Sequence, residues 1–245
     1  AYEITYGDWS SDVCSSDLSR DYRQWESTFR RTIGLVGEVW VIDLVAGGRR
    51  VRVPVGAHAC QLATSSGEAE QTALAFLRDG LQSGERCVTL VPQAAADALC
   101  VHLGASEIDL DDAVGSGRLV VDSTDSHTAA GRQFDPYRLV ARHLTDVGTS
   151  NTTRLRVLVD MNSYAGAGNP EGLLRYEAAC HAAMQAYAGR VVVLAQYRYG
   201  DLPGDTVIGM LRLHPSTVVA QYVRRNPNPA DPVAFMARLL HRTSP

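Results

Sequence analysis

Two residues whose side chains could bind a ligand or a metal ion begin an apolar segment of this chain. His58 and Cys60 lie two positions apart, so on a β-strand both side chains point to the same face. An imidazole and a thiol can contact a bound molecule, and both also serve as metal ligands. The alternative is structural, with a buried cysteine packing beside a hydrogen-bonded histidine. Because the spacing places no third or fourth ligand beside this pair, we expect no metal ion and no other cofactor.

The loop after this pair, Thr64-Ser65-Ser66-Gly67-Glu68, stands where a phosphate-binding loop would stand. The stretch 58–92 has the strand–loop–helix–strand layout that begins an ATP-binding domain of the RecA type. A working phosphate loop supplies several glycine N–H groups, a lysine for the phosphates and a hydroxyl for Mg²⁺. This loop has one glycine and no lysine. Glu68 and Glu70 instead add negative charge at the start of a helix, where a phosphate would bind. We therefore expect a degenerate loop that neither binds nor hydrolyses ATP.

Polar residues also follow other predicted strands. In a parallel sheet, ligands bind outside the carboxyl ends of the strands. Asp160 ends the segment 154–160, where RecA-type ATPases keep the acidic residue that holds Mg²⁺. Each of these residues also has a structural alternative, such as capping a loop, closing a core edge or stabilising a turn. We predict that the contacts to a small ligand include Asp160, Asn162, Tyr164, Tyr197 and His214, beside His58 and Cys60.

Composition and motifs argue against several function classes. The chain lacks the G-x-S-x-G and H-E-x-x-H motifs and a glycine-rich dinucleotide loop, so we expect no enzyme. A net charge of −4 argues against direct nucleic-acid binding. No apolar run approaches the roughly 20 residues that span a bilayer, so we expect no membrane insertion. The absence of C-x-x-C spacing argues against a disulfide framework. A cytoplasmic location is the expectation.

Strand and helix patterns alternate along most of the chain. This order predicts an α/β fold with three layers, RecA- or P-loop-like, in which helices cover both faces of a mainly parallel sheet. Ser66 is the expected N-cap of the first helix. The predicted strands are 86–91, 119–121, 154–160 and 190–197, the predicted helices are 68–82, 94–103, 136–143 and 172–187, and segments 207–213 and 218–222 complete the pattern.

The two ends of the chain are set apart from the predicted domain. Residues 1–18 look like a translated sequencing adapter, and residues 19–50 form an uncertain N-terminal extension. The predicted domain spans 51–228. Residues 229–245 are expected to be a C-terminal tail, within which 233–241 could form a short helix.

Several short motifs together resemble the MEDS family, the sensory domain named for methanogens, methylotrophs and a dichloromethane-responsive regulator. The resemblance implies a fold related to RecA and the circadian-clock ATPases that has lost nucleotide hydrolysis. It also adds Glu177 to the candidate ligand contacts. The chain departs from the family pattern at Leu62 and Ala63, where an aromatic residue is usual, and no output module is expected within residues 1–245. The motifs are H-x-C at 58–60, F-L-x-x-G-L-x-x-G-E at 76–85, G-R-L at 117–119, F-D-P at 134–136, R-x-x-x-D-M at 156–161, Y-E at 176–177, Q-Y at 196–197 and H-P at 214–215.

The resemblance implies a function in bacterial signalling. The domain is expected to sense a small apolar or weakly polar organic molecule, a hydrocarbon derivative, without catalysis. The expected protein partner is a kinase, an anti-sigma factor or a transcription regulator. Two alternatives remain at this stage: a divergent RecA- or clock-like nucleotide-binding ATPase, and an interaction module whose pocket is vestigial.

Overall fold

The computed structural model describes residues 41–46, 49–54, 58–124, 154–162, 170–186, 190–219 and 222–242. Tyr164, the predicted helix 136–143 and the segment 1–18 lie outside these residues. The described residues form an α/β fold with a seven-stranded sheet. A separate pair of antiparallel strands precedes this sheet in the sequence: β1 (Val41–Ala46) and β2 (Arg49–Pro54).

The seven-stranded sheet has the order β5-β4-β6-β7-β3-β8-β9. All neighbours pair in parallel except β8 and β9, which are antiparallel. The predicted fold class, a three-layer α/β fold with a mainly parallel sheet, is therefore confirmed. The strands are β3 (His58–Ala63), β4 (Arg86–Val91), β5 (Leu119–Ser123), β6 (Leu155–Asp160), β7 (Val191–Arg198), β8 (Ser216–Val219) and β9 (Tyr222–Arg225).

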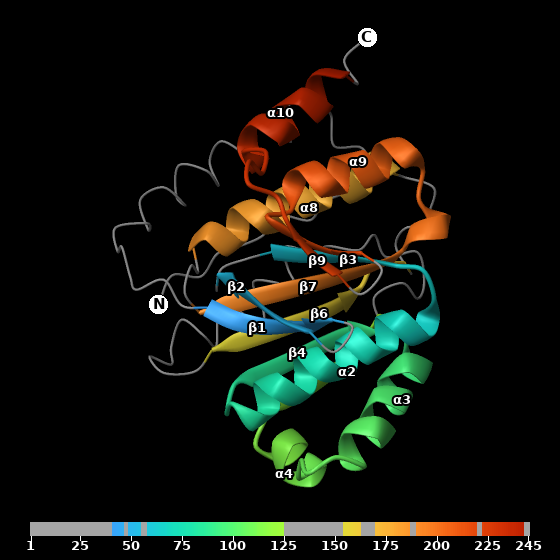
Figure 1. Cartoon of the computed structure of the whole chain (residues 1–245), viewed down its shortest axis with the longest axis vertical. Helices are drawn as coiled ribbons and strands as arrows, with labels where there is room; N and C mark the ends of the chain where they lie inside the picture. The colour runs from blue at the N-terminus through green and yellow to red at the C-terminus, as the bar shows by residue number, and fades with distance from the viewer. Residues whose placement is uncertain are drawn as a thin grey trace, which may run out of the picture.

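Helices cover both faces of this sheet (Figure 1). One face, here called the α2 face, packs against α2 (Ser66–Gln82), α3 (Gln93–Gly104) and α4 (Leu110–Gly115). The opposite face, the α8 face, packs against α8 (Pro170–Ala186), α9 (Gly204–Leu213) and α10 (Pro232–Arg242). The central strands are apolar on both sides because both sides are covered. Each face has its own hydrophobic core.

The segment expected to be a C-terminal tail contains α10, and this helix contributes to the core. Phe235, Met236 and Leu239 are buried in the α8-face core. Their i, i+1, i+4 spacing places them on one side of the helix. The short helix that the sequence suggested for 233–241 is confirmed.

Helix α2 begins at Ser66, two residues before the predicted start at residue 68, and its N-cap lies one residue before the predicted one. Ser65, not Ser66, is the N-cap: its backbone is extended (φ −148°, ψ 159°) and its hydroxyl accepts from the Glu68 N–H. Ser66 already has helical geometry and cannot fill that position. The helix ends before Gly84, whose φ of +70° is in the left-handed region that favours glycine.

A buried arginine joins α2 to β6. Arg156 pairs with Glu85 and, at 2.7 Å, with Asp79, and it also donates to the carbonyl oxygen of Phe76 at 3.0 Å. Its guanidinium carbon lies 5.3 Å from the centre of the Phe76 ring. Gly80 makes room for it, because a Cβ there would lie 2.7 Å from the Arg156 Cδ. The glycine of the F-L-x-x-G-L motif is thus required by close packing.

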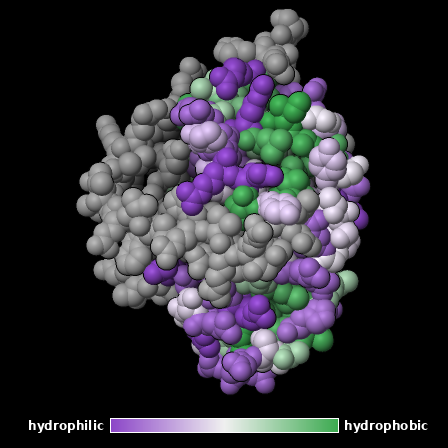
Figure 2. Space-filling view, viewed as in Figure 1, coloured by the Kyte–Doolittle hydropathy of each residue, from purple (hydrophilic) through white to green (hydrophobic). Residues whose placement is uncertain are grey.

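Part of the outer surface over α9 is apolar. Ile208 and Leu211 of this helix are 49% and 40% exposed, and Figure 2 shows hydrophobic residues gathered at the upper right, over α9.

Among the described helices, none combines the length and hydrophobicity needed to cross a membrane.

Candidate functional site

The β3–α2 loop, which would hold phosphate in a nucleotide-binding domain, is filled by a side chain of its own helix. The Glu68 carboxylate accepts from the backbone N–H of Thr64 at 2.8 Å and from its hydroxyl at 2.6 Å. Glu68 is only 8% exposed. Its charge lies in the first turn of α2, where the helix dipole favours an anion. Glu70, predicted to act alongside it, turns away and pairs with His102 of α3 at 2.8 Å.

Amide side chains fill the neighbouring ends of β3 and β7. Gln196 donates to the side-chain oxygen of Gln61 at 2.6 Å and to the carbonyl of Ala69 at 2.8 Å. Gln61 in turn donates to the hydroxyl of Thr72 at 2.9 Å. Together with Thr64 and Glu68, these residues form the carboxyl-edge network. Their polar atoms bind one another, so α2 is tied directly to the strand ends.

Asp160 and Asn162 form a turn at the end of β6. The Asp160 carboxylate accepts from the backbone and side-chain N–H groups of Asn162, at 2.8 and 2.6 Å. The side-chain oxygen of Asn162 accepts from the backbone N–H of Arg198 at 2.6 Å. These hydrogen bonds fit the structural alternative for Asp160, and the prediction that Asp160 and Asn162 contact a ligand stays a prediction.

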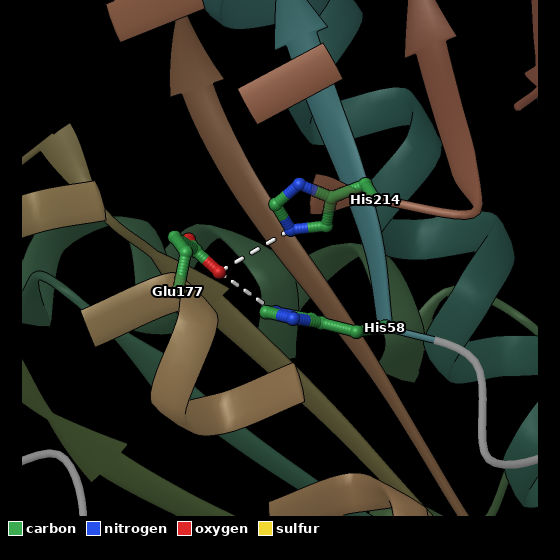
Figure 3. A group of neighbouring side chains, drawn as sticks. All are labelled: His58, Glu177 and His214. Carbon is green, nitrogen blue, oxygen red and sulfur yellow. Dashed lines mark ion pairs between the residues drawn. The ribbon is translucent and has the colours of Figure 1, made fainter. Parts of the chain in front are cut away.

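A second polar cluster lies inside the α8 face, and Figure 3 shows three of its members. His58 begins β3, Glu177 lies in the middle of α8, and His214 follows α9. Their exposed fractions are 1%, 0% and 0%. The Oε2 atom of Glu177 lies 3.0 Å from His58 Nε2 and 3.3 Å from His214 Nε2. Tyr197 of β7 donates its hydroxyl to the other carboxylate oxygen, Oε1. We call these four residues the α8-face cluster.

The cluster leaves several polar atoms unpaired. Within the described part of the chain, His58 Nε2, His214 Nε2 and Glu177 Oε2 have no partner that meets hydrogen-bond geometry. His214 Nδ1 lies 2.8 Å from the carbonyl oxygen of Met210. Since a carbonyl only accepts, this nitrogen carries a proton. The neutral form of His214 then presents a lone pair, not a proton, to Glu177.

Burial and charge act in opposite directions on these groups. Burial lowers the pKa of His58, although the Glu177 carboxylate opposes that shift. Burial would raise the pKa of Glu177, but the attraction of the two imidazoles outweighs it and holds that pKa at about 2. Burial, with the Glu177 charge, raises the pKa of the Cys60 thiol well above its usual range. The cluster therefore favours an ionised Glu177 carboxyl and a protonated Cys60 thiol.

A third histidine lies beside the cluster. His181 follows Glu177 by one helical turn, as the E-x-x-x-H spacing predicts, and its ring centre is 6.2 Å from that of His58. Its Nδ1 has no hydrogen-bond partner among the described residues. Burial is the largest cause that lowers its pKa to about 3, and the neighbouring imidazoles add to this effect.

The predicted ligand contacts therefore fall into two groups that the sheet separates. Asp160, Gln196 and Gln61 are register partners on three adjacent strands, so their side chains share the α2 face. His58 and Tyr197 point to the other face, as does Cys60, which belongs to the α8-face core. Asp160 thus does not join His58, Cys60 and Tyr197 in one pocket, because strand alternation sends its side chain to the opposite side.

Sequence reasoning missed the roles of Gln61 and Thr72. Both are buried, and a buried polar residue inside an apolar strand is a signal in itself, because it requires a partner. Gln61 stands one position after Cys60, so alternation alone places its side chain opposite the His58–Cys60 pair.

Comparison with known proteins gives one family. A family model described as the MEthanogen/methylotroph, DcmR Sensory domain (MEDS) matches residues 57–215. No curated protein matches the sequence. Among solved structures, a KaiC-like protein from the hyperthermophilic archaeon Pyrococcus horikoshii OT3 is similar, with 13% identity, a TM-score of 0.49, and coverage of 74% of this chain and 81% of that chain. The residues matched by the family model include the whole carboxyl-edge network and the whole α8-face cluster.

Proposed function

The chain belongs to the MEDS family of sensory domains, and on that premise we propose that it senses a small, weakly polar organic molecule without catalysis. The expected ligand is a hydrocarbon derivative. The expected output, from the cytoplasm of a bacterium, is a change in contact with a signalling partner such as a kinase, an anti-sigma factor or a transcription regulator.

One observation carries the proposal against a nucleotide. The Glu68 carboxylate accepts both polar hydrogens of Thr64 at the loop where phosphate oxygens would need them. A triphosphate there would meet a negative charge and would find no lysine to offset its own. A domain of this architecture with such a loop is suited to a ligand other than ATP.

The α8-face cluster supports a ligand site on the opposite side of the sheet. Burying a carboxylate and two imidazoles costs free energy that apolar side chains of similar volume would avoid. The residues around them are apolar, and they include Cys60, Met210 and Leu213. Small-molecule sites commonly combine an apolar lining with a few converging polar groups. We therefore propose that the ligand is bound on the α8 face, with Cys60 in contact with its apolar part.

Ligand binding can be tested with two matched cysteine variants. Native mass spectrometry of the purified full chain shows which small molecule is retained, and thermal unfolding with short alcohols, ketones and halogenated hydrocarbons ranks the candidates. A ligand at 100 times its Kd stabilises the folded state by about 2.7 kcal/mol. Cys60→Ala should reduce this ligand-dependent stabilisation, whereas Cys87→Ala, equally buried but on the α2 face, should retain it.

The same assay with Mg-ATP tests the nucleotide-binding alternative. We expect no rise in melting temperature and no hydrolysis at millimolar nucleotide. A Mg²⁺-dependent rise, or ATPase activity that Asp160→Asn abolishes, would contradict the proposed function.

The carboxyl-edge network favours a second candidate. Its polar groups bind one another at the strand ends, as expected of an interaction module whose former pocket is vestigial. This candidate predicts that the domain binds a protein partner with no small molecule. If the chain retains an organic ligand in native mass spectrometry, or if such a ligand raises its melting temperature, this second candidate is wrong.

A further inference from the structure

Among the described residues, four buried polar atoms of the α8-face cluster have no hydrogen-bond partner, and all of them except His58 Nδ1 converge on one point. His58 Nε2, Glu177 Oε2 and His214 Nε2 all lie within 4.8 Å of one another. Two ligands of a tetrahedral Zn²⁺ ion, at bond lengths of about 2.0–2.2 Å, lie about 3.3 Å apart. The distances from Glu177 Oε2 to the two nitrogens are 3.0 and 3.3 Å. The cluster thus already has the spacing of a metal-binding site.

The position of the proton on His214 independently favours a cation at this point. Because His214 donates from Nδ1 to Met210, its Nε2 faces the Glu177 carboxylate with a lone pair unless a cation lies between them. Two lone pairs facing each other at 3.3 Å in a buried site repel. An added proton would relieve one such contact. A single metal ion would satisfy His58 Nε2, Glu177 Oε2 and His214 Nε2 together, and His58 Nδ1 would still lack a partner among the described residues.

His214 and Glu177 have the supporting contacts that orient metal ligands. A metal-bound histidine commonly donates its other N–H to a backbone carbonyl, and His214 does so to Met210. A ligating carboxylate is itself commonly hydrogen-bonded, and Tyr197 donates to Glu177 Oε1, which leaves Oε2 for the metal.

We propose that His58, Glu177 and His214 bind one divalent transition-metal ion, with Zn²⁺ or Fe²⁺ preferred by two imidazoles and one carboxylate. The site goes beyond the proposed function, because it needs no organic ligand and would exist whichever molecule the domain senses. Three protein ligands leave a coordination position for water or for an oxygen atom of a bound molecule.

Metal content and affinity test the site directly. The purified full chain is loaded with Zn²⁺ alone, dialysed and analysed for metal, and its affinity is measured against a competing chelator. We expect one ion per chain. Glu177→Gln and His214→Asn should each weaken binding by more than about 100-fold, beyond the effect of losing a supporting hydrogen bond. His102→Asn removes a half-exposed histidine outside the cluster and should leave affinity unchanged.

A measurement on the unmodified chain keeps the test decisive if a cluster variant fails to fold. Co²⁺ replacing Zn²⁺ should give the visible absorption bands of a four- or five-coordinate ion, saturating at one equivalent. Removal of Zn²⁺ by EDTA should lower the melting temperature. A chain that retains no metal and gives no such bands overturns the site, as does unchanged affinity in folded Glu177→Gln. Neither result bears on organic ligand binding, which the Cys60→Ala comparison measures separately.

Discussion

The Glu68 carboxylate in the β3–α2 loop should stabilise the fold, and its contribution can be worked from its contacts. A hydrogen bond to a charged group contributes about 1.5–3 kcal/mol when shielded from water. Thr64 is exposed, so water replaces part of this, and we assign about 1.5 kcal/mol to the two bonds together. A negative charge in the first helical turn adds about 0.5 kcal/mol. Glu68→Ala should therefore cost about 2 kcal/mol, and Glu68→Gln, which keeps one acceptor, about half as much.

Urea unfolding followed by circular dichroism measures this difference. The matched control is Glu70→Ala, two positions along the same helix, where the lost contact is a half-exposed pair with His102. Such pairs contribute little, so the control should change the free energy of unfolding by less than about 0.5 kcal/mol. The m-value should stay the same in all variants, because the buried area is unchanged. Equal losses for the two alanine variants would refute the view that Glu68 takes the place of a phosphate.

Three further variants test other parts of the structure. Arg156→Met should lower the free energy of unfolding by about 3 kcal/mol, because it removes a charge partner from the buried Glu85 and the partly buried Asp79. Arg154→Met, at a 37% exposed side chain, should cost less than about 1 kcal/mol. Gly209→Ala places a Cβ 2.7 Å from a leucine of α8 and should cost about 1–3 kcal/mol, whereas Gly204→Ala meets open space and should cost nothing. Since the folded pKa of His181 is lowered to about 3, the unfolded chain binds its proton first, and stability should fall as the pH drops from about 6.5 towards 3. His181→Leu should flatten that pH dependence in urea titrations.

Much of the fold could be predicted because the strands that form it are buried on both faces. The segments 86–91 and 154–160 are rich in valine and leucine and predict strands, and the structure has strands at 86–91 and 155–160. The helix after β3 was equally clear from its apolar spacing. The exact start of this helix could not be predicted, because Ser65 and Ser66 have the same side chain. Only the extended backbone of Ser65 identifies it as the N-cap.

The α8-face cluster could be predicted only in part. His58, Glu177, Tyr197 and His214 are each candidates from the sequence, but no local spacing shows that α8, β7 and the end of α9 bring the last three to β3. That meeting depends on strand order, which places β3 next to both β7 and β8. The same topology decides that Asp160 points away, because its partner in register is Gln196 and not Tyr197. Relative register between strands is a property of the assembled sheet.

The position of β3 has a consequence for how the chain folds as it is made. His58–Ala63 is the first strand of the seven-stranded sheet to leave the ribosome, yet both its neighbours, β7 and β8, come from residues 191–219. Strand β4 can pair with β5 and with β6 once residues 86–160 have been made. The backbone groups of β3 stay unpaired until β7 and β8 have been made. Pairings between such distant segments form slowly and leave edges exposed to aggregation. We expect β3 to close the sheet last, so that the core and the buried histidine–carboxylate cluster are completed in one late step.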